Sequence, residues 1–186
     1  MAHLTDTDVI KNVLGCFNLE PNSTLRDPRA RDITPADLED HLDGTSVILQ
    51  PGDHIAIRRC ADDYIWHHGI VVNHKEVVDM NKKAPYIEKR GLAKFLGLAQ
   101  GHANFVVIDY SMEDEAAGLV HSREQSANYA LELAELATKT PITYKVLSHN
   151  CESFATLCRC GRYAIPSLKD SLHQLMASAY PPLPKF

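Results

Sequence analysis

The chain has 186 residues, of which 45% are hydrophobic and 23% are charged, and its formal net charge is -5 at pH 7. This composition is typical of one soluble globular domain, and the absence of a basic patch argues against DNA or RNA as a partner. No apolar run approaches the roughly 18 residues that span a bilayer, and no secretory signal pattern opens the chain, so we expect a single cytoplasmic catalytic unit.

The first 45 residues predict a helical arm in which no chemistry is visible. Residues 7 to 16 have the spacing of a short helix, and the polar residues 18 to 32, with two prolines, indicate a loop. A second helix is expected to begin after Thr34, because Thr34-Pro35-Ala36-Asp37 supplies a capping hydroxyl, a proline at the first helical position and a carboxylate at the third.

The middle of the chain changes to the pattern of an antiparallel meander. Short β-branched runs occupy residues 53 to 59, 64 to 72 and 76 to 80, with a turn-like Asn73-His74-Lys75 between the last two. A less regular segment over residues 82 to 101 contains one short helix in LAKFLGLA, and ANFVVIDY (103 to 110) predicts another strand. The acidic Glu113-Asp114-Glu115 that follows is interpreted as a solvated loop.

The last part of the chain alternates helix and strand. A capping box at Ser122-Arg123-Glu124-Gln125 opens a helix that ends before Thr140-Pro141. TYKVL (143 to 147) predicts a strand, CESFATLCRC a helix that stops before Gly161, and Ser167 caps a final helix. The order predicts an α+β fold, an antiparallel meander packed against helices, with an arm (1 to 45), a main domain (46 to 179) and an extended tail (180 to 186).

Cys151 is the candidate nucleophile. The five cysteines, at positions 16, 60, 151, 158 and 160, form no CxxC pair and fit free thiols in a reducing compartment. Cys151 falls at the expected start of a helix, where unpaired N–H groups and the helix dipole favour a thiolate. The alternative is a cysteine that only packs in the core. Glu152 follows it, and a negative charge there would oppose thiolate formation.

A nucleophilic thiol needs a base, and the base needs an orienting group. His67 and His68 lie next to each other on a predicted strand, and Asp79 lies on the neighbouring strand. Alternate residues of a strand face opposite sides, so Asp79 shares a face with His67 if the hairpin loop has an odd number of residues, and with His68 if the number is even. The residues alone leave both pairings open.

The motifs PGDHIAI, HHGIVV and VVDM, followed by NCESF and CRCGRY, resemble the lecithin:retinol acyltransferase-like family, permuted relatives of NlpC-type, papain-like cell-wall peptidases. The resemblance covers about residues 49 to 163. By position it implies that Cys151 is the nucleophile, His67 the base, with His68 as its bulky neighbour, and Asp79 the third catalytic residue. The third residue of the family is usually histidine, and a carboxylate also orients an imidazole, as in Cys-His-Asp triads.

The implied activity is that of a cysteine-dependent acyltransferase or hydrolase. Cys151 would attack an ester, thioester or amide carbonyl and hold the acyl group as a thioester until water, an amine or an alcohol takes it. Main-chain N–H groups at the start of the Cys151 helix would hold the oxyanion, with Tyr64 and Asn150 as supporting residues.

No cofactor or metal is expected. His54, His74 and His149 match no zinc-binding spacing and are interpreted as turn or surface histidines. The expected partner is an acyl-bearing substrate, with lipids among the candidates. Animal acyltransferases of the family carry a hydrophobic C-terminal anchor, whereas this chain ends in SAYPPLPKF, so the membrane contact we expect is at most peripheral.

Two alternatives remain open. A peptidase or amidase would use the same three residues, because thioester chemistry does not dictate the acyl donor. A catalytically inactive interaction or signalling module would keep the fold and use residues 1 to 45 as a docking arm.

Overall fold

The computed structural model describes residues 29–58, 66–83, 86–97, 105–116, 120–139 and 151–160. The helices expected at residues 7 to 16 and after Ser167, and the strand expected at 143 to 147, lie outside these residues. The division of the chain at residues 45 and 179 stays a prediction.

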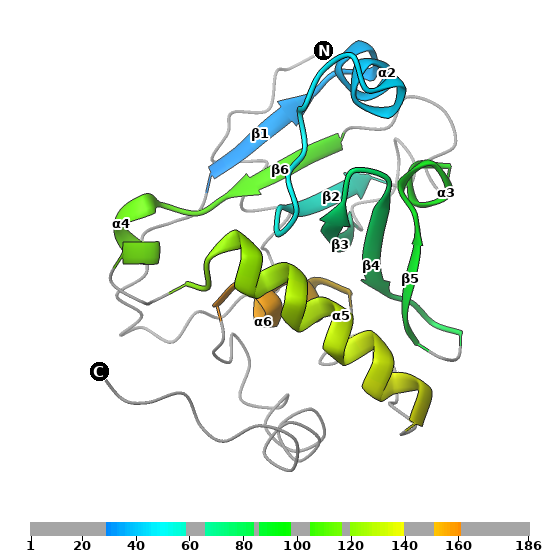
Figure 1. The fold of residues 1–186 in the computed structure, drawn as a ribbon, viewed down its shortest axis with the longest axis vertical. Coiled ribbons are helices and arrows are strands. Elements are labelled where there is room, and N and C mark those ends of the chain that lie inside the picture. The colour runs from blue at the N-terminus through cyan, green and yellow to red at the C-terminus, as the bar shows by residue number, and fades with distance from the viewer. Residues whose placement is uncertain are drawn as a thin grey trace.

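The described strands form one antiparallel sheet in the order β1-β6-β2-β3-β4-β5 (Figure 1). The predicted α+β fold is confirmed, as is the meander of the second, third and fourth strands. The strands are β1 (Arg29–Ile33), β2 (His54–Arg58), β3 (Trp66–Asn73), β4 (Glu76–Met80), β5 (Ile87–Gly91) and β6 (Phe105–Asp109). The helices are α2 (Pro35–Asp43), α3 (Leu92–Leu96), α4 (Met112–Ala116), α5 (Arg123–Lys139) and α6 (Cys151–Cys160).

Three parts of the secondary-structure prediction are wrong. The loop expected over residues 18 to 32 ends in β1, which pairs with β6. The irregular segment expected over 82 to 101 contains β5, which pairs with β4. The acidic loop at Glu113-Asp114-Glu115 is part of α4. β1 and β5 are the two ends of the described sheet, and their sequences, RARDI and IEKRG, carry more charge than apolar alternation. Pairing with a neighbouring strand, rather than hydrophobic pattern, decides such edge strands.

The predicted starts of α2 and α5 are confirmed. The Thr34 hydroxyl accepts the Asp37 N–H (3.2 Å), and the Asp37 carboxylate accepts the Thr34 N–H (2.9 Å), which completes a capping box at α2. Ser122 and Gln125 exchange the same pair of hydrogen bonds ahead of α5, at 3.2 and 2.9 Å. These bonds satisfy N–H groups that have no partner inside the helix.

Helices cover both faces of the sheet, so two core clusters form. The first core lies between the sheet and the helices α5 and α6, and the second includes α3 and the partly buried side of α2. Because alternate residues of a strand go to different cores, β3 and β4 are apolar at consecutive positions. The first core includes Ile70, Val78, Leu133, Cys151 and Phe154, and the second includes Ile55, Val71, Val77, Leu92 and Phe95.

The turn Pro51-Gly52-Asp53 directly precedes β2 and packs against the start of α5. Gly52 has a φ of +91°, and a Cβ there would lie 2.0 Å from the backbone oxygen of Arg123, so only glycine allows this approach. Asp53 binds the Arg123 side chain (2.7 Å) with one carboxylate oxygen and accepts the Gln50 N–H (2.8 Å) with the other. The PGD motif therefore fixes α5 against the sheet.

Candidate active site

Cys151 is the first residue of α6, as the sequence predicts. Its side chain belongs to the first core and is 5% exposed, and all ten residues of α6 are buried. The N–H groups of the first helical turn have no partner within the helix and lie at the positive end of its dipole. Both features favour negative charge at or next to the sulfur.

A β-bulge decides which histidine Asp79 meets. The turn between Asn73 and Glu76, which are paired, contains two residues, and an even number would put Asp79 on the face of His68. The register shifts between Val71 and Asn73, however, and this bulge pairs Asp79 with Gly69 instead. Gly69 shares a face with His67, so the bulge brings Asp79 diagonally across from His67.

The structure brings His67, Asp79 and Cys151 together. Asp79 Oδ2 accepts a hydrogen bond from His67 Nε2 at 2.6 Å, and both side chains are buried. His67 also shares a side-chain hydrogen bond with Cys151. The ring of Phe95, from the second core, stacks on the His67 ring with 5.2 Å between centroids. The three residues thus join both cores.

The surroundings of His67 favour its protonated form. Burial lowers the pKa of His67, but the hydrogen bonds and charges of Asp79 and Cys151 outweigh burial, so the pKa is raised above its ordinary value. An imidazole stabilised as a cation is suited to take a proton from a neighbouring thiol.

His68 contacts other residues than His67 does. Its Nδ1 lies 2.9 Å from Nε2 of His54, whose Nδ1 lies 2.9 Å from the Tyr110 hydroxyl. Burial lowers the pKa of His54 to about 3, and burial also lowers that of His68 well below its usual value. Both stay neutral in a buried polar network. The interpretation of His54 as a turn or surface histidine is therefore wrong, because it lies on β2 and is fully buried.

Arg90 is a neighbour of the site that the sequence did not indicate. Its Nε lies 2.7 Å from Asp79 Oδ1, the carboxylate oxygen that does not face His67. The contact forms because β5 pairs with β4, and the hydrophobic pattern did not predict β5. A single arginine in a charged segment did not stand out in the sequence as a candidate site residue. Glu88, on the same strand, contacts the Arg90 guanidinium.

Glu152 does not present the negative charge that its position suggests. Its side chain is buried, and burial raises its pKa to about 8. Among the described residues, Glu152 Oε1 has no hydrogen-bond partner, in keeping with a neutral carboxyl group. At neutral pH most of the Glu152 side chains are protonated, so the expected opposition to a Cys151 thiolate is weak.

The other predicted residues divide between described and undescribed parts of the chain. Tyr64, Asn150 and His149 lie outside the described residues. His74 lies in the β3–β4 turn, where its carbonyl accepts a hydrogen bond from His41 at 3.0 Å. In the described part of the chain, no three His, Cys, Asp or Glu side chains form a group that could hold a metal ion.

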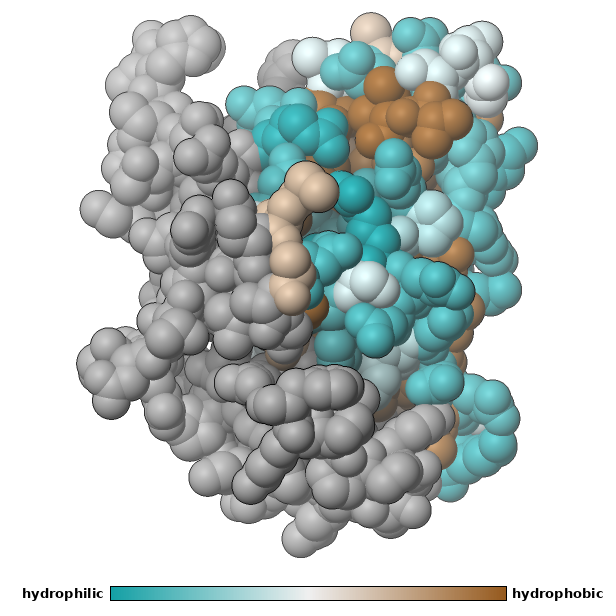
Figure 2. Space-filling view, turned by 60° about the vertical axis from the view of Figure 1, so that its left-hand side comes forward, coloured by the Kyte–Doolittle hydropathy of each residue, from teal (hydrophilic) through white to brown (hydrophobic). Residues whose placement is uncertain are grey.

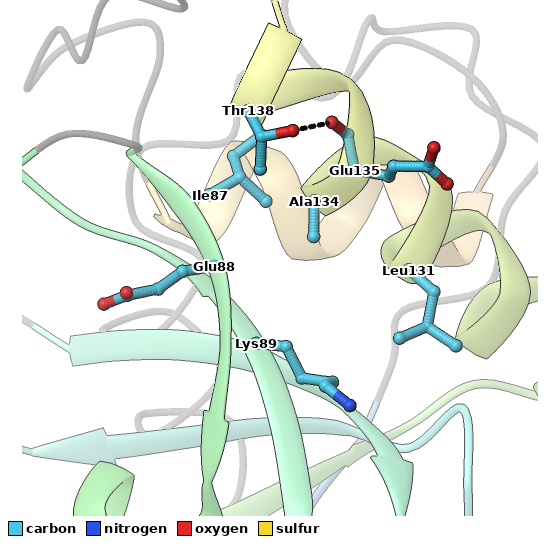
Figure 3. A pocket seen from close by; sticks show the side chains of 7 residues that line it. All are labelled: Ile87, Glu88, Lys89, Leu131, Ala134, Glu135 and Thr138. Atoms are coloured by element: carbon cyan, nitrogen blue, oxygen red, sulfur yellow. Dashed lines mark hydrogen bonds between the residues drawn. The ribbon is translucent and has the colours of Figure 1, made fainter.

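An apolar groove lies apart from these residues, between β5 and α5 (Figure 3). Its volume is about 270 Å³, and Figure 3 shows Leu131 and Ala134 projecting from α5 towards the strand that carries Ile87 and Lys89. None of His67, Asp79 and Cys151 lines it. The remaining lining residues are Glu88, Glu135 and Thr138.

One face of the described molecule is mostly polar (Figure 2). On the face in Figure 2 the described residues are largely hydrophilic, with one compact hydrophobic patch near the top. Of the helices that the structure describes, none has the length and the apolar character needed to cross a bilayer.

This site has the arrangement typical of thiol-dependent enzymes, on an α+β fold. A buried cysteine at the start of a helix is hydrogen-bonded to a histidine, and a carboxylate contacts that histidine. The family model for lecithin retinol acyltransferase matches residues 48–164, and the chain belongs to this family. The predicted resemblance is confirmed, and membership indicates an enzyme of the acyltransferase type. A comparison with curated proteins found none that matches the chain.

Proposed function

We propose that the protein is a cysteine-dependent acyltransferase or hydrolase in which Cys151 is the nucleophile, His67 the base and Asp79 the residue that orients His67. The observation that carries the proposal is that His67 is hydrogen-bonded to Asp79 and to Cys151 at once, in a buried site where its pKa is raised. A nucleophile, a base and an orienter in contact are what thiol catalysis requires.

The contacts suggest the order of proton transfers. Asp79 accepts from Nε2–H of His67, so Nδ1 is the ring nitrogen left to take the Cys151 proton. The thiolate then attacks the carbonyl carbon of the acyl donor, and His67 returns the proton to the leaving group as the bond to it breaks. Water, an alcohol or an amine, deprotonated by His67, attacks the thioester carbonyl, and the Cys151 sulfur leaves and recovers its proton.

The start of α6 supports the second requirement, stabilisation of the oxyanion. The N–H groups of the first turn have no helical acceptor and lie beside the sulfur, where the negative oxygen of the tetrahedral intermediate would form. Tyr64 and Asn150 stay supporting predictions. The acyl donor we propose is a lipid or a small ester or amide, with peripheral membrane contact for a lipid donor.

The first test is the pH dependence of Cys151 alkylation by iodoacetamide in the native protein, located by peptide mass spectrometry. We expect labelling well below the free-thiol pKa of about 8.5, because His67 stabilises the thiolate. His67→Ala should move labelling up to the range of a free thiol, and Cys151→Ala should abolish it at position 151, which fragment spectra distinguish from Cys158.

Cys158 is the internal control, because it lies on the same helix and burial raises its pKa well above the usual value. His74→Gln is the matched histidine control, since His74 lies in the β3–β4 turn, where it contacts His41. Slow labelling of Cys151, at the same rate in wild type and in His67→Ala, would contradict the enzyme proposal and favour the interaction module. If the thiol is reactive, trapping by a lipid ester or by a peptide-like electrophile separates the acyltransferase from the peptidase.

A further inference from the structure

Asp79 makes a hydrogen bond with one carboxylate oxygen and an ion pair with the other; the atoms of the ion pair, Asp79 Oδ1 and Arg90 Nε, have no hydrogen-bond partner among the described residues. Oδ2 lies 2.6 Å from His67 Nε2, and Oδ1 lies 2.7 Å from Arg90 Nε. The Asp79 side chain is 0% exposed and that of Arg90 is 8% exposed, so solvent screens this contact little. A carboxylate this deeply buried is stable as an anion only when nearby cations and donors compensate its lost hydration.

The strand pairing fixes Arg90 in this position. β4 and β5 pair Val77 with Arg90 and Asp79 with Glu88, so Arg90 is the diagonal neighbour of Asp79 on the same face. The other end of the guanidinium contacts Glu88, whose Oε1 also accepts a hydrogen bond from Asn81 (3.2 Å). Arg90 is therefore held between a buried and a half-exposed carboxylate.

We propose that Arg90 is a positioning residue that holds the Asp79 carboxylate against His67 and thereby sets the pH range in which His67 activates Cys151. The inference rests on the proposed function, because it concerns the same three residues. A guanidinium stays charged throughout the pH range of proteins, so its effect on Asp79 does not switch off as His67 titrates.

Arg90 acts on Cys151 through Asp79 and His67. With Arg90 paired to Oδ1, the Oδ2 oxygen of Asp79 is held towards His67 Nε2, so the Nε2 proton stays in place and Nδ1 stays free for the thiol proton. Without Arg90, Asp79 is held less firmly against His67 and stabilises a protonated His67 less. The titratable or charged groups around this path in the described structure are Cys151 from α6, His67 and His68 from β3, and Glu88 and Arg90 from β5, and α3 contributes the uncharged Phe95.

The test is the pH–rate profile of Cys151 alkylation in four full-length proteins: wild type, Arg90→Met, Arg90→Lys and Lys89→Met. We expect Arg90→Met to move the midpoint up by at least about one pH unit, which slows labelling roughly tenfold below the midpoint. Arg90→Lys keeps the charge and should restore most of the profile. Lys89→Met removes the adjacent cation, whose side chain is 46% exposed and paired with Glu76, and should match wild type.

A double-mutant cycle separates the effect on Asp79 from a general loss of structure. Asp79→Asn removes the charge that needs a countercharge, so Asp79→Asn/Arg90→Met should have the midpoint of Asp79→Asn alone. Circular dichroism verifies the fold of each variant, and Arg90→Gln takes the place of Arg90→Met if the latter does not fold. An unchanged midpoint on loss of Arg90, or the same shift in the Asp79→Asn background, overturns the role of Arg90 alone. A wild-type Cys151 that labels slowly and independently of His67 overturns the proposed function as well.

Discussion

His67 and His68 are neighbours in the chain, yet their surroundings give them opposite acid–base properties. The pKa of His67 is raised because Asp79 and Cys151 outweigh burial, whereas burial keeps His68 neutral beside His54. Pairs of groups whose environments separate their pKa values are where acid–base roles can be assigned. Of the two, only His67 combines a thiol contact with a carboxylate contact in the described structure.

The raised pKa of Glu152 predicts how the stability of the protein depends on pH. Its pKa is about 8 in the folded chain and near 4.5 unfolded, so between these values only the folded state holds the proton and stability falls as the pH rises. Glu152→Gln removes this loss. We expect its free energy of unfolding, relative to wild type, to increase from pH 5 to pH 8 by up to about 1.4 kcal/mol per pH unit.

Urea denaturation of both proteins at pH 5, 6.5 and 8 measures this difference. Glu124→Gln, an exposed first-turn glutamate of α5, is the matched control and should show no comparable trend. A constant difference between Glu152→Gln and wild type at all three pH values would mean that Glu152 is ionised in the folded protein.

The β3–β4 hairpin and α3 together hold the His67 side chain in place. Gly69 lies opposite Asp79, and Phe95 covers both Gly69 and the His67 ring. A Cβ at position 69 would lie 2.7 Å from Val77 Cγ2 and 3.1 Å from Phe95 Cε2. The small residue therefore lets the aromatic ring of α3 pack directly against the strand that carries His67.

Gly69→Ala is accordingly expected to displace Phe95 and disturb His67. Overpacking of this kind costs about 1–3 kcal/mol of stability, and alkylation of Cys151 below pH 8 should slow. Urea denaturation and the labelling rate are the two measurements. Gly91→Ala is the matched control, since the nearest atom to a Cβ there is 4.0 Å away, and it should label like wild type. Equal labelling of the two variants would show that Phe95 does not hold His67 in place.

Taken together, the buried titratable groups of the described residues predict a stability maximum near pH 6.5. Burial lowers the pKa of His41, His54, His68 and His121 from the usual 6.5, so below that pH the unfolded chain takes up protons that the folded chain does not. Stability should fall as the pH drops from 6.5 to 4.5. Above 6.5, the raised pKa values of His67 and Glu152 make it fall as the pH rises.

Unfolding free energies from urea titrations at pH 4.5, 5.5, 6.5 and 8 test this. Each strongly shifted histidine contributes up to about 1.4 kcal/mol per pH unit on the acid side. Glu152 opposes the histidines there, so Glu152→Gln should steepen the acid slope and flatten the alkaline one. A protein as stable at pH 5 as at pH 6.5 would contradict neutral burial of the histidines.

Local chemistry was enough for much of the fold and for the position of Cys151. The β-branched runs predicted β2, β3, β4 and β6, capping residues predicted the starts of α2 and α5, and the NCESF motif placed Cys151 at the first residue of α6. These features depend on residues close together in the chain. The charged edge strands β1 and β5 had no such local signal, because the neighbouring strand decides their conformation.

The residues around Cys151 required the tertiary structure. Parity left Asp79 between His67 and His68, and the bulge between Val71 and Asn73 makes the choice, since one additional residue reverses which side chains share a face. Arg90, Phe95 and the neutral Glu152 depend on contacts and burial that only the packed sheet and helices create. The order of amino acids sets which groups are available for chemistry, and long-range packing brings particular groups into contact and sets their charge state.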